Sequence, residues 1–170
     1  MAFNQLKYCG KILEDYAFSP EFFKADKEIP YDYYRFNIGP DNRGRSRFMI
    51  VNMLGSNKQS EDSIESDILL QLSVIFPFKV SEGAFREMAR VLMFFNRSLD
   101  IPGFGMDELS GHIYFRYAFM KPEGVIPRKT FLSLISIIML AVDSYSEDIE
   151  AVASGLSVRE VMQNSLERIL

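Results

Sequence analysis

The segment 68–80 limits most strongly how this chain can fold, because hydrophobic residues occupy every second position in it. These positions are Ile68, Leu70, Leu72, Val74, Phe76, Phe78 and Val80. Side chains alternate between the two faces of a β-strand, so the pattern predicts a strand with one packed and one more polar face. Such strands are typical of an antiparallel sheet that is covered on one side. Pro77 cannot donate a hydrogen bond to a neighbouring strand, which predicts an edge or a bulge near this end.

The rest of the chain shows the same alternation in further strands and helical spacing in several segments. Strands are expected at 31–38, 47–54, 104–108 and 112–120, and helices at 3–16, 81–98, 127–154 and from 157 onward. The charged segment 21–30 is interpreted as a connection, and the polar segment 55–66 as a mobile loop. The order α-β-β-β-α-β-β-α with an added C-terminal helix predicts an α+β fold, in which an antiparallel sheet carries its helices on one face.

Length and charge narrow the class of protein. The 170 residues suit a single domain, with 156–170 as a helical extension of it. A net charge of −4 argues against broad attraction to nucleic acid or to anionic membranes. The segment 131–142 is the most apolar stretch and is shorter than the roughly 20 residues that span a bilayer. The N-terminal segment lacks the apolar core of a signal peptide. We therefore expect a cytoplasmic protein.

Few residues in the chain could support catalysis. His112 is the only histidine, which excludes metal sites that need two histidine ligands, and Cys9 is the only cysteine. Both are interpreted as structural, Cys9 as a buried thiol and His112 as a hydrogen-bonded residue after a turn. The pair Gly103 and Gly105 lacks the third glycine of a nucleotide-binding loop. We expect no cofactor, no metal and no enzymatic activity.

Three arginines are candidates for binding an anion. Arg43, Arg45 and Arg47 are spaced by two on the way into a predicted strand, so their guanidinium groups could lie on one side. Guanidinium groups suit phosphate and carboxylate ligands. The alternative is that they form a solvated turn and protect a strand edge from unwanted pairing.

The strand at 47–54 is apolar on both faces. Met49, Val51 and Met53 share one face, whereas Phe48 and Ile50 share the other. Either the strand is central and covered twice, or one face contacts another chain. Methionine adapts to varied partners, which makes Met49, Val51 and Met53 candidates for partner binding. Core packing is the competing interpretation.

The predicted helix at 127–154 is apolar around most of its circumference. A helix of this kind must be buried on all sides. In a domain of this size, a subunit interface is one way to achieve that burial. The pattern therefore predicts a homodimer with Ile137, Ile138 and Leu140 at the interface.

Several short motifs resemble the YbjN family, which shares the type III secretion chaperone-like fold. They are Arg47-Phe48, Phe95-Asn96, Pro102-Gly103-Phe104, Gly111, Arg116, Asp143, Tyr145 and Gly155. The resemblance covers roughly 1–155 and leaves out the last helix and the acidic loop. It implies an acidic homodimer that holds proteins or peptides.

Together these patterns predict a non-catalytic protein-binding module. It would be chaperone-like or regulatory, and would act as a homodimer that holds a protein or peptide client, with no nucleic acid or membrane partner. The alternative hypothesis is a regulator that senses a small anion through Arg43, Arg45 and Arg47.

Overall fold

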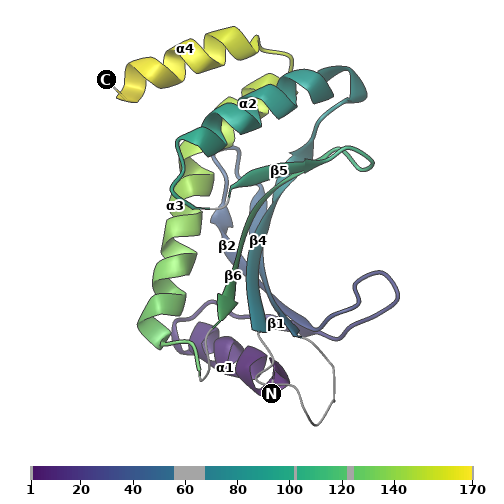
Figure 1. Ribbon diagram of the computed structural model, residues 1–170, viewed down its shortest axis with the longest axis vertical. Coiled ribbons are helices and arrows are strands. Elements are labelled where there is room, and N and C mark those ends of the chain that lie inside the picture. The colour runs from purple at the N-terminus through teal and green to yellow at the C-terminus, as the bar shows by residue number, and fades with distance from the viewer. Residues whose placement is uncertain (1, 56–67, 102, 122–124, 170) are drawn as a thin grey trace.

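A computed structural model describes residues 2–55, 68–101, 103–121 and 125–169. Within these ranges the chain is an α+β domain built on one six-stranded antiparallel sheet, in the order β1-β2-β3-β4-β6-β5 (Figure 1). The strands are β1 (Glu21–Phe23), β2 (Tyr33–Pro40), β3 (Ser46–Gly55), β4 (Ile68–Lys79), β5 (Phe104–Asp107) and β6 (His112–Lys121). The helices are α1 (Ala2–Asp15), η1 (Glu82–Ala84), α2 (Phe85–Arg97), α3 (Arg128–Ala153) and α4 (Val158–Ile169). The predicted fold class is confirmed.

β4 lies at the centre of the sheet, as its long alternating pattern requires. It pairs with β3 on one side and with β6 on the other. Pairing with β3 stops at Val74, and the register with β6 shifts between Ile75 and Lys79. Pro77 lies inside that irregularity, so the predicted bulge is confirmed.

β1 is a strand that the sequence analysis missed. The segment 21–30 was interpreted as a connection, yet Phe22 and Phe23 pair with Tyr34 and Tyr33 of β2. The rings of Phe23 and Tyr33 stack at 4.9 Å between centroids. Aromatic pairs across two strands stabilise the pairing of a strand as short as this one. The predicted loop at 55–66 lies almost entirely outside the described residues.

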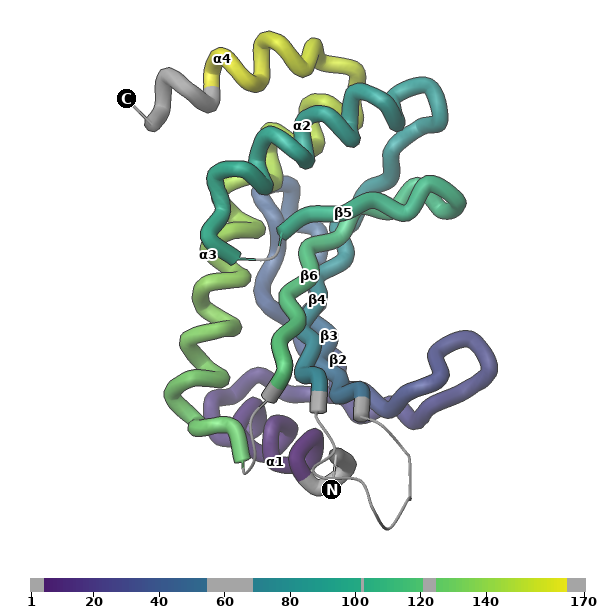
Figure 2. The backbone as a smooth tube through the Cα atoms, in the orientation of Figure 1, coloured from purple at the N-terminus to yellow at the C-terminus, as the bar shows by residue number. Residues whose placement is uncertain are grey.

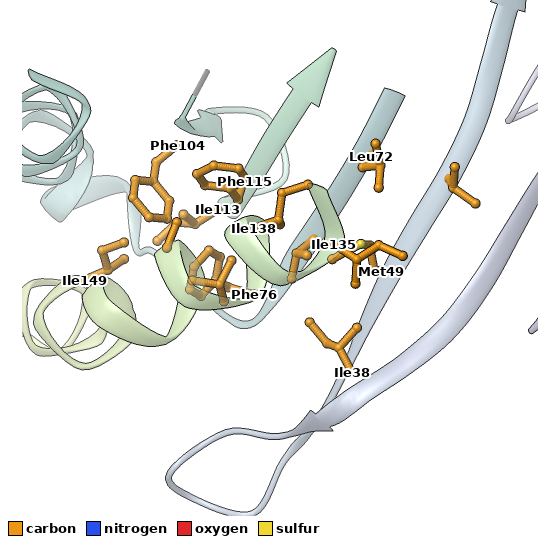
Figure 3. Packing of buried hydrophobic residues seen from close by; sticks show 14 of the residues in the cluster. Ile38, Met49, Leu72, Phe76, Phe104, Ile113, Phe115, Ile135, Ile138 and Ile149 are labelled. Carbon is orange, nitrogen blue, oxygen red and sulfur yellow. The ribbon is translucent and has the colours of Figure 1, made fainter. Parts of the chain in front are cut away.

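All the helices lie on one side of the sheet (Figures 1 and 2). α3 runs along the length of the sheet, α1 lies across one end and α2 lies near β5. The core fills the space between α3 and the sheet, where Ile135 and Ile138 meet residues such as Met49, Leu72 and Phe115 (Figure 3). Hydrophobic burial on this side is the main stabilising term of the fold.

The junction between α2 and β5 depends on one asparagine side chain. Asn96 accepts a hydrogen bond from the Phe104 backbone N–H at 2.7 Å and donates one to the Phe104 carbonyl at 2.9 Å. A Cβ atom on Gly103 would lie 1.9 Å from Asn96 Oδ1, so only glycine leaves room for this arrangement. Tyr145 of α3 packs on both Phe95 and Phe104 at the same junction.

α3 ends as the sequence predicts. Gly155 has φ +99°, a left-handed conformation that glycine adopts without strain. The Leu156 N–H donates to the Ala151 carbonyl, and the Gly155 N–H donates to the Val152 carbonyl. This Schellman motif satisfies the last carbonyl groups of the helix.

Candidate functional site

The side of the sheet that faces away from the helices carries no other element among the described residues (Figure 1). We call this surface the open face. Strand register arranges its side chains in rows across the sheet. Ile75 pairs with Tyr114, and Phe48 lies on the same face of β3, just beyond the end of its pairing with β4. The next row contains Glu21, Arg35, Ile50, Ser73 and Arg116, and the one after it Phe23, Tyr33, Asn52, Gln71 and Ala118. Leu54, Leu69 and Met120 form a further row.

Large apolar side chains on the open face are in contact with solvent. Ile75 is 47 % exposed, Met120 is 56 % exposed and Phe48 is 38 % exposed. Burial of apolar surface against a partner would stabilise a complex by roughly 25 cal/mol for each Å² removed from water. Several exposed apolar residues on one flat sheet are typical of a surface that binds another molecule.

Two arginines lie among these apolar side chains. The Arg35 guanidinium lies 4.8 Å from the ring centre of Phe23 and 5.1 Å from that of Phe48. It also pairs with Glu21 at 2.6 Å. The Arg116 guanidinium lies 5.5 Å from the ring centre of Tyr114. A guanidinium that lies over an aromatic ring keeps its N–H groups at the edge, where they can bind acceptors from another molecule.

Asn52 lies in the middle of the open face and was missed by the sequence analysis. It is fully buried, and its Nδ2 atom has no hydrogen-bond acceptor among the residues that the structure describes. Its Oδ1 atom accepts a long 3.4 Å hydrogen bond from Gln71. A buried donor without a partner costs about 1–3 kcal/mol. The signal in the sequence was an amide inside the apolar run 47–54.

Met49, Val51 and Met53 do not form a partner-binding surface in this structure. Met49 and Val51 are 0 % exposed and Met53 is 7 % exposed, because their face of β3 packs against the helices. This corrects the predicted role of these three residues and agrees with the competing interpretation of core packing. The second apolar face of the strand carries Phe48 and Ile50, and it belongs to the open face.

The arginine cluster is occupied by carboxylates of the chain itself. Arg45 forms two hydrogen bonds to Glu150, at 2.8 and 2.6 Å, and a third to Asp41 at 2.6 Å. Arg43 pairs with Glu150 at 3.2 Å. These contacts fasten the turn between β2 and β3 to the last turns of α3. Because the cations are neutralised by acids on both elements, the geometry speaks against the predicted anion site.

Arg47 has a similar structural role and is 6 % exposed. Its guanidinium pairs with Asp143 at 2.5 Å and donates to the carbonyl groups of Gly39 and Pro40. A buried guanidinium needs such partners, because the loss of hydration would otherwise be uncompensated. Arg47 and Asp143 both belong to the motifs of the YbjN resemblance, and here they join β3 to α3.

We expect the turn between β2 and β3 to become less stable in acid. Burial acts to raise the pKa of Asp41, but hydrogen bonds from Arg45 and Arg43 outweigh it and hold the pKa below its usual value. The stability that Asp41 contributes is therefore complete above its unfolded pKa of about 3.9 and disappears as the pH falls through the lower folded value.

The measurement is urea unfolding of the wild type and of Asp41→Asn between neutral and acidic pH. The difference in unfolding free energy should be full at neutral pH and should shrink below about pH 4. Asp100→Asn, at an exposed carboxylate, is the control and should show no such change. A difference for Asp41→Asn that stays constant across this range contradicts the argument.

The three residues predicted for a dimer interface are divided between two sides of α3. Ile138 is fully buried in the core (Figure 3), so its assignment to an interface is wrong for this structure. Leu140 is 68 % exposed and Ile137 is 44 % exposed. The helix is therefore not buried on all sides, and its outer face remains in contact with solvent.

The residues considered for catalysis lie far apart or in local turns. Cys9 is buried in α1. His112 Nδ1 lies 2.9 Å from Ser110 Oγ, which donates to Asp107 at 2.6 Å, and these three residues stabilise the turn between β5 and β6. Within the ranges that the structure covers, no group of three or more His, Cys, Asp or Glu side chains could hold a metal ion.

α3 is long and apolar enough to cross a membrane when judged by length and composition alone. The core helix of a soluble protein passes the same test, and α3 packs residues such as Phe131 and Ile135 into the core.

Comparison with known proteins provides no family. No protein-family model matches the chain, and a search of curated proteins finds no significant match. The resemblance to the YbjN family therefore stays a prediction.

Proposed function

We propose that the protein is a non-catalytic binding module, which acts as a homodimer and holds a protein or peptide partner on its open face. The observation that supports this most directly is a six-stranded sheet with one face packed and the other open. On that open face Phe48, Ile75 and Met120 are exposed to solvent. A chaperone-like or regulatory role in the cytoplasm accords with this proposal and with what the YbjN resemblance implies.

The chemistry of the open face suits an extended segment with alternating apolar and acidic residues. Neighbouring positions on one face of a strand are about 7 Å apart, which is also the repeat of an extended peptide. Phe48 and Ile75 offer apolar contacts, while Arg116 offers donors to a carboxylate. Asn52 Nδ2 adds a donor that no described group accepts from. Because Asn52 is fully buried, the side chains around it would need to move before a partner could reach it.

A second function based on anion sensing is not favoured. The three arginines that suggested it are paired with Asp41, Asp143 and Glu150. An incoming phosphate would have to displace these carboxylates and break the contact between the β2–β3 turn and α3.

The test uses a random-peptide display library as the probe for the full chain. Selected peptides should be rich in apolar and acidic residues, and a labelled peptide should bind with a measurable change in fluorescence anisotropy. Ile75→Asp and Arg116→Glu should each weaken its binding at least about tenfold, which corresponds to roughly 1.4 kcal/mol. Both residues are exposed, so thermal melting should stay close to that of the wild type.

Met93→Asp is the matched control. Met93 is 73 % exposed on α2, away from the open face, so this change should leave peptide binding unaltered. Selection of no peptide, or of peptides that bind Ile75→Asp as well as the wild type, would falsify the assignment of the site to the open face.

A further inference from the structure

The outer face of α3 is the second uncovered surface of the molecule. The inner face of this helix packs Ile135, Ile138 and Val142 into the core. The opposite side exposes Leu140 and Ile137, and no other described element lies over the middle of the helix there (Figures 1 and 2). In water, an exposed leucine and isoleucine on one helix face favour contact with another apolar surface.

Exposed residues on this side recur at steps of three or four and form one continuous stripe, as helical geometry requires. We call it the outer stripe, and its members are Lys129, Ser133, Ser136, Ile137, Leu140, Ser144 and Glu147. Ser136 and Ser144 donate their hydroxyls to the carbonyl groups of Leu132 and Leu140. Their side chains are therefore small and already hydrogen-bonded, so another helix can approach closely without leaving a hydroxyl unsatisfied.

The outer stripe contains both a protruding side chain and a space to receive one. Leu140 is the protruding residue. About one turn earlier, Leu132, Ser133, Ser136 and Ile137 line part of an open groove of about 730 Å³ that also includes Tyr16, Arg128 and Lys129. A side chain inserting between residues of a facing helix is the packing found in helix pairs. One helix thus carries both halves of a self-complementary contact.

Charge along α3 indicates the direction of the facing helix. The first turn of α3 contains Arg128 and Lys129 and no acid, and its last turns contain Glu147 and Glu150 and no base. Of these, Arg128 already pairs with Asp15, Glu150 pairs with Arg43 and Arg45, and Glu147 accepts a hydrogen bond from Asn42. Lys129 and Glu147 are the charged members of the outer stripe. This distribution opposes the helix dipole, which favours acids at the N-terminus and bases at the C-terminus. An antiparallel helix of the same sequence would place Lys129 beside Glu147 at both ends. A parallel helix would place like charges together.

The centre of this antiparallel helix pair coincides with the two exposed apolar residues of the outer stripe. Ile138 lies midway between Lys129 and Glu147 in the sequence, and Ile137 and Leu140 lie on either side of it on the outer stripe. A two-fold axis near this position places each Leu140 opposite the groove beside Ile137 of the other copy. Both the apolar contact and the charge contacts are then made twice, as an isologous interface requires.

We propose that α3 packs antiparallel against α3 of a second copy, with Leu140 in the partner's groove and Lys129 beside the partner's Glu147. This inference rests on the homodimer in the proposed function, but it uses a surface separate from the open face. The two open faces therefore stay accessible in the dimer. A lipid bilayer is the competing occupant of the outer stripe, and it is disfavoured by the charged ends of the stripe and by a net charge of −4.

The first experiment measures the mass of the full chain in solution by light scattering after size-exclusion chromatography. The wild type should show a mass near twice 19.6 kDa, and Leu140→Asp should be monomeric. Met93→Asp, the exposed control on α2, should remain dimeric. A wild type that is monomeric at every concentration, or a dimer that survives Leu140→Asp, overturns the proposal.

Charge reversal tests the direction of the helices. Lys129→Glu and Glu147→Lys should each weaken the dimer at least tenfold, and the double variant should recover most of the loss. Within one chain the two residues are five turns of helix apart, so recovery requires contact between chains. Each single change also improves the match with the helix dipole. Because Glu147→Lys removes the hydrogen bond that Glu147 accepts from Asn42, the thermal melting of each monomer is measured alongside, and it should stay close to that of the wild type. No recovery in the double variant overturns the antiparallel arrangement.

Two further measurements distinguish the α3 dimer from a membrane contact, and failure of the dimer from failure of peptide binding. Flotation with phosphatidylcholine vesicles should leave the protein in the aqueous fraction, whereas flotation that depends on Leu140 overturns the proposal in favour of a membrane contact. Leu140→Asp should still bind the selected peptide through the open face. A wild-type protein that is monomeric but binds this peptide would overturn the dimer and leave peptide binding on the open face standing. A wild-type dimer that binds no peptide would overturn peptide binding on the open face and leave the α3 contact standing.

Discussion

Replacing Gly111 by alanine is expected to lower the free energy of unfolding by about 3 kcal/mol. Gly111 adopts φ +71°, which costs an L-residue about 1–2 kcal/mol. A Cβ atom at this position would also lie 2.7 Å from the Val80 carbonyl oxygen, which belongs to the backbone and cannot rotate away. Relief of that clash would disturb the hydrogen bond from the Val80 N–H to the Gly111 carbonyl.

Gly44→Ala separates the conformational cost of a positive φ from the steric clash with the Val80 carbonyl. Gly44 has a similar φ of +78°, but nothing lies within 4 Å of a Cβ atom there. This control should lose only the conformational term, about 1–2 kcal/mol. Urea unfolding of both variants measures the comparison. Equal losses for Gly44→Ala and Gly111→Ala would show that the contact with Val80 contributes nothing.

The second large effect concerns the junction between α2 and β5. We expect Gly103→Ala and Asn96→Ala each to lower the unfolding free energy by about 2 kcal/mol. The new methyl group would occupy the position of Asn96 Oδ1, so the first change should expel the side chain that the second removes. In both variants the Phe104 N–H and carbonyl lose their partner.

A double-mutant cycle tests this shared cause. The variant that combines both changes should be about as stable as either single variant, since the second change has no hydrogen bond left to break. Additive losses, about 4 kcal/mol in the double variant, would contradict the mechanism. Arg97→Ala, an exposed neighbour on the same helix, serves as the control and should change stability by less than about 0.5 kcal/mol.

Secondary structure could be predicted from the sequence where a segment carries one clear signal, such as hydrophobic residues that recur at a regular spacing. β4 shows a strict alternation over its length, and the end of α3 is marked by a glycine in the left-handed region. β1 has only three residues, which is too short for any period to be visible. Its pairing depends on the aromatic residues Tyr33 and Tyr34, which lie on a strand formed later in the chain.

The candidate site was harder to predict, because it depends on which face of a strand the helices cover. Met49 and Phe48 are both apolar, so the sequence predicted two possible faces for β3, and only the packing of the helices distinguishes them. The arginine cluster was misread for a related reason. Arg45 pairs with Glu150, a residue more than a hundred positions away in the sequence. The spacing of neighbouring residues contains no information about such a contact.

The open face allows the binding specificity of this protein to change by substitution. The core on the helix side is packed without any partner, so the domain can fold before the other side of the sheet binds anything. Positions such as Ile75 and Arg116 can vary in size and charge at little energetic cost, on a rigid support that fixes their spacing. A domain of this kind can acquire new specificities by surface substitution, and it offers a scaffold from which binding reagents could be selected.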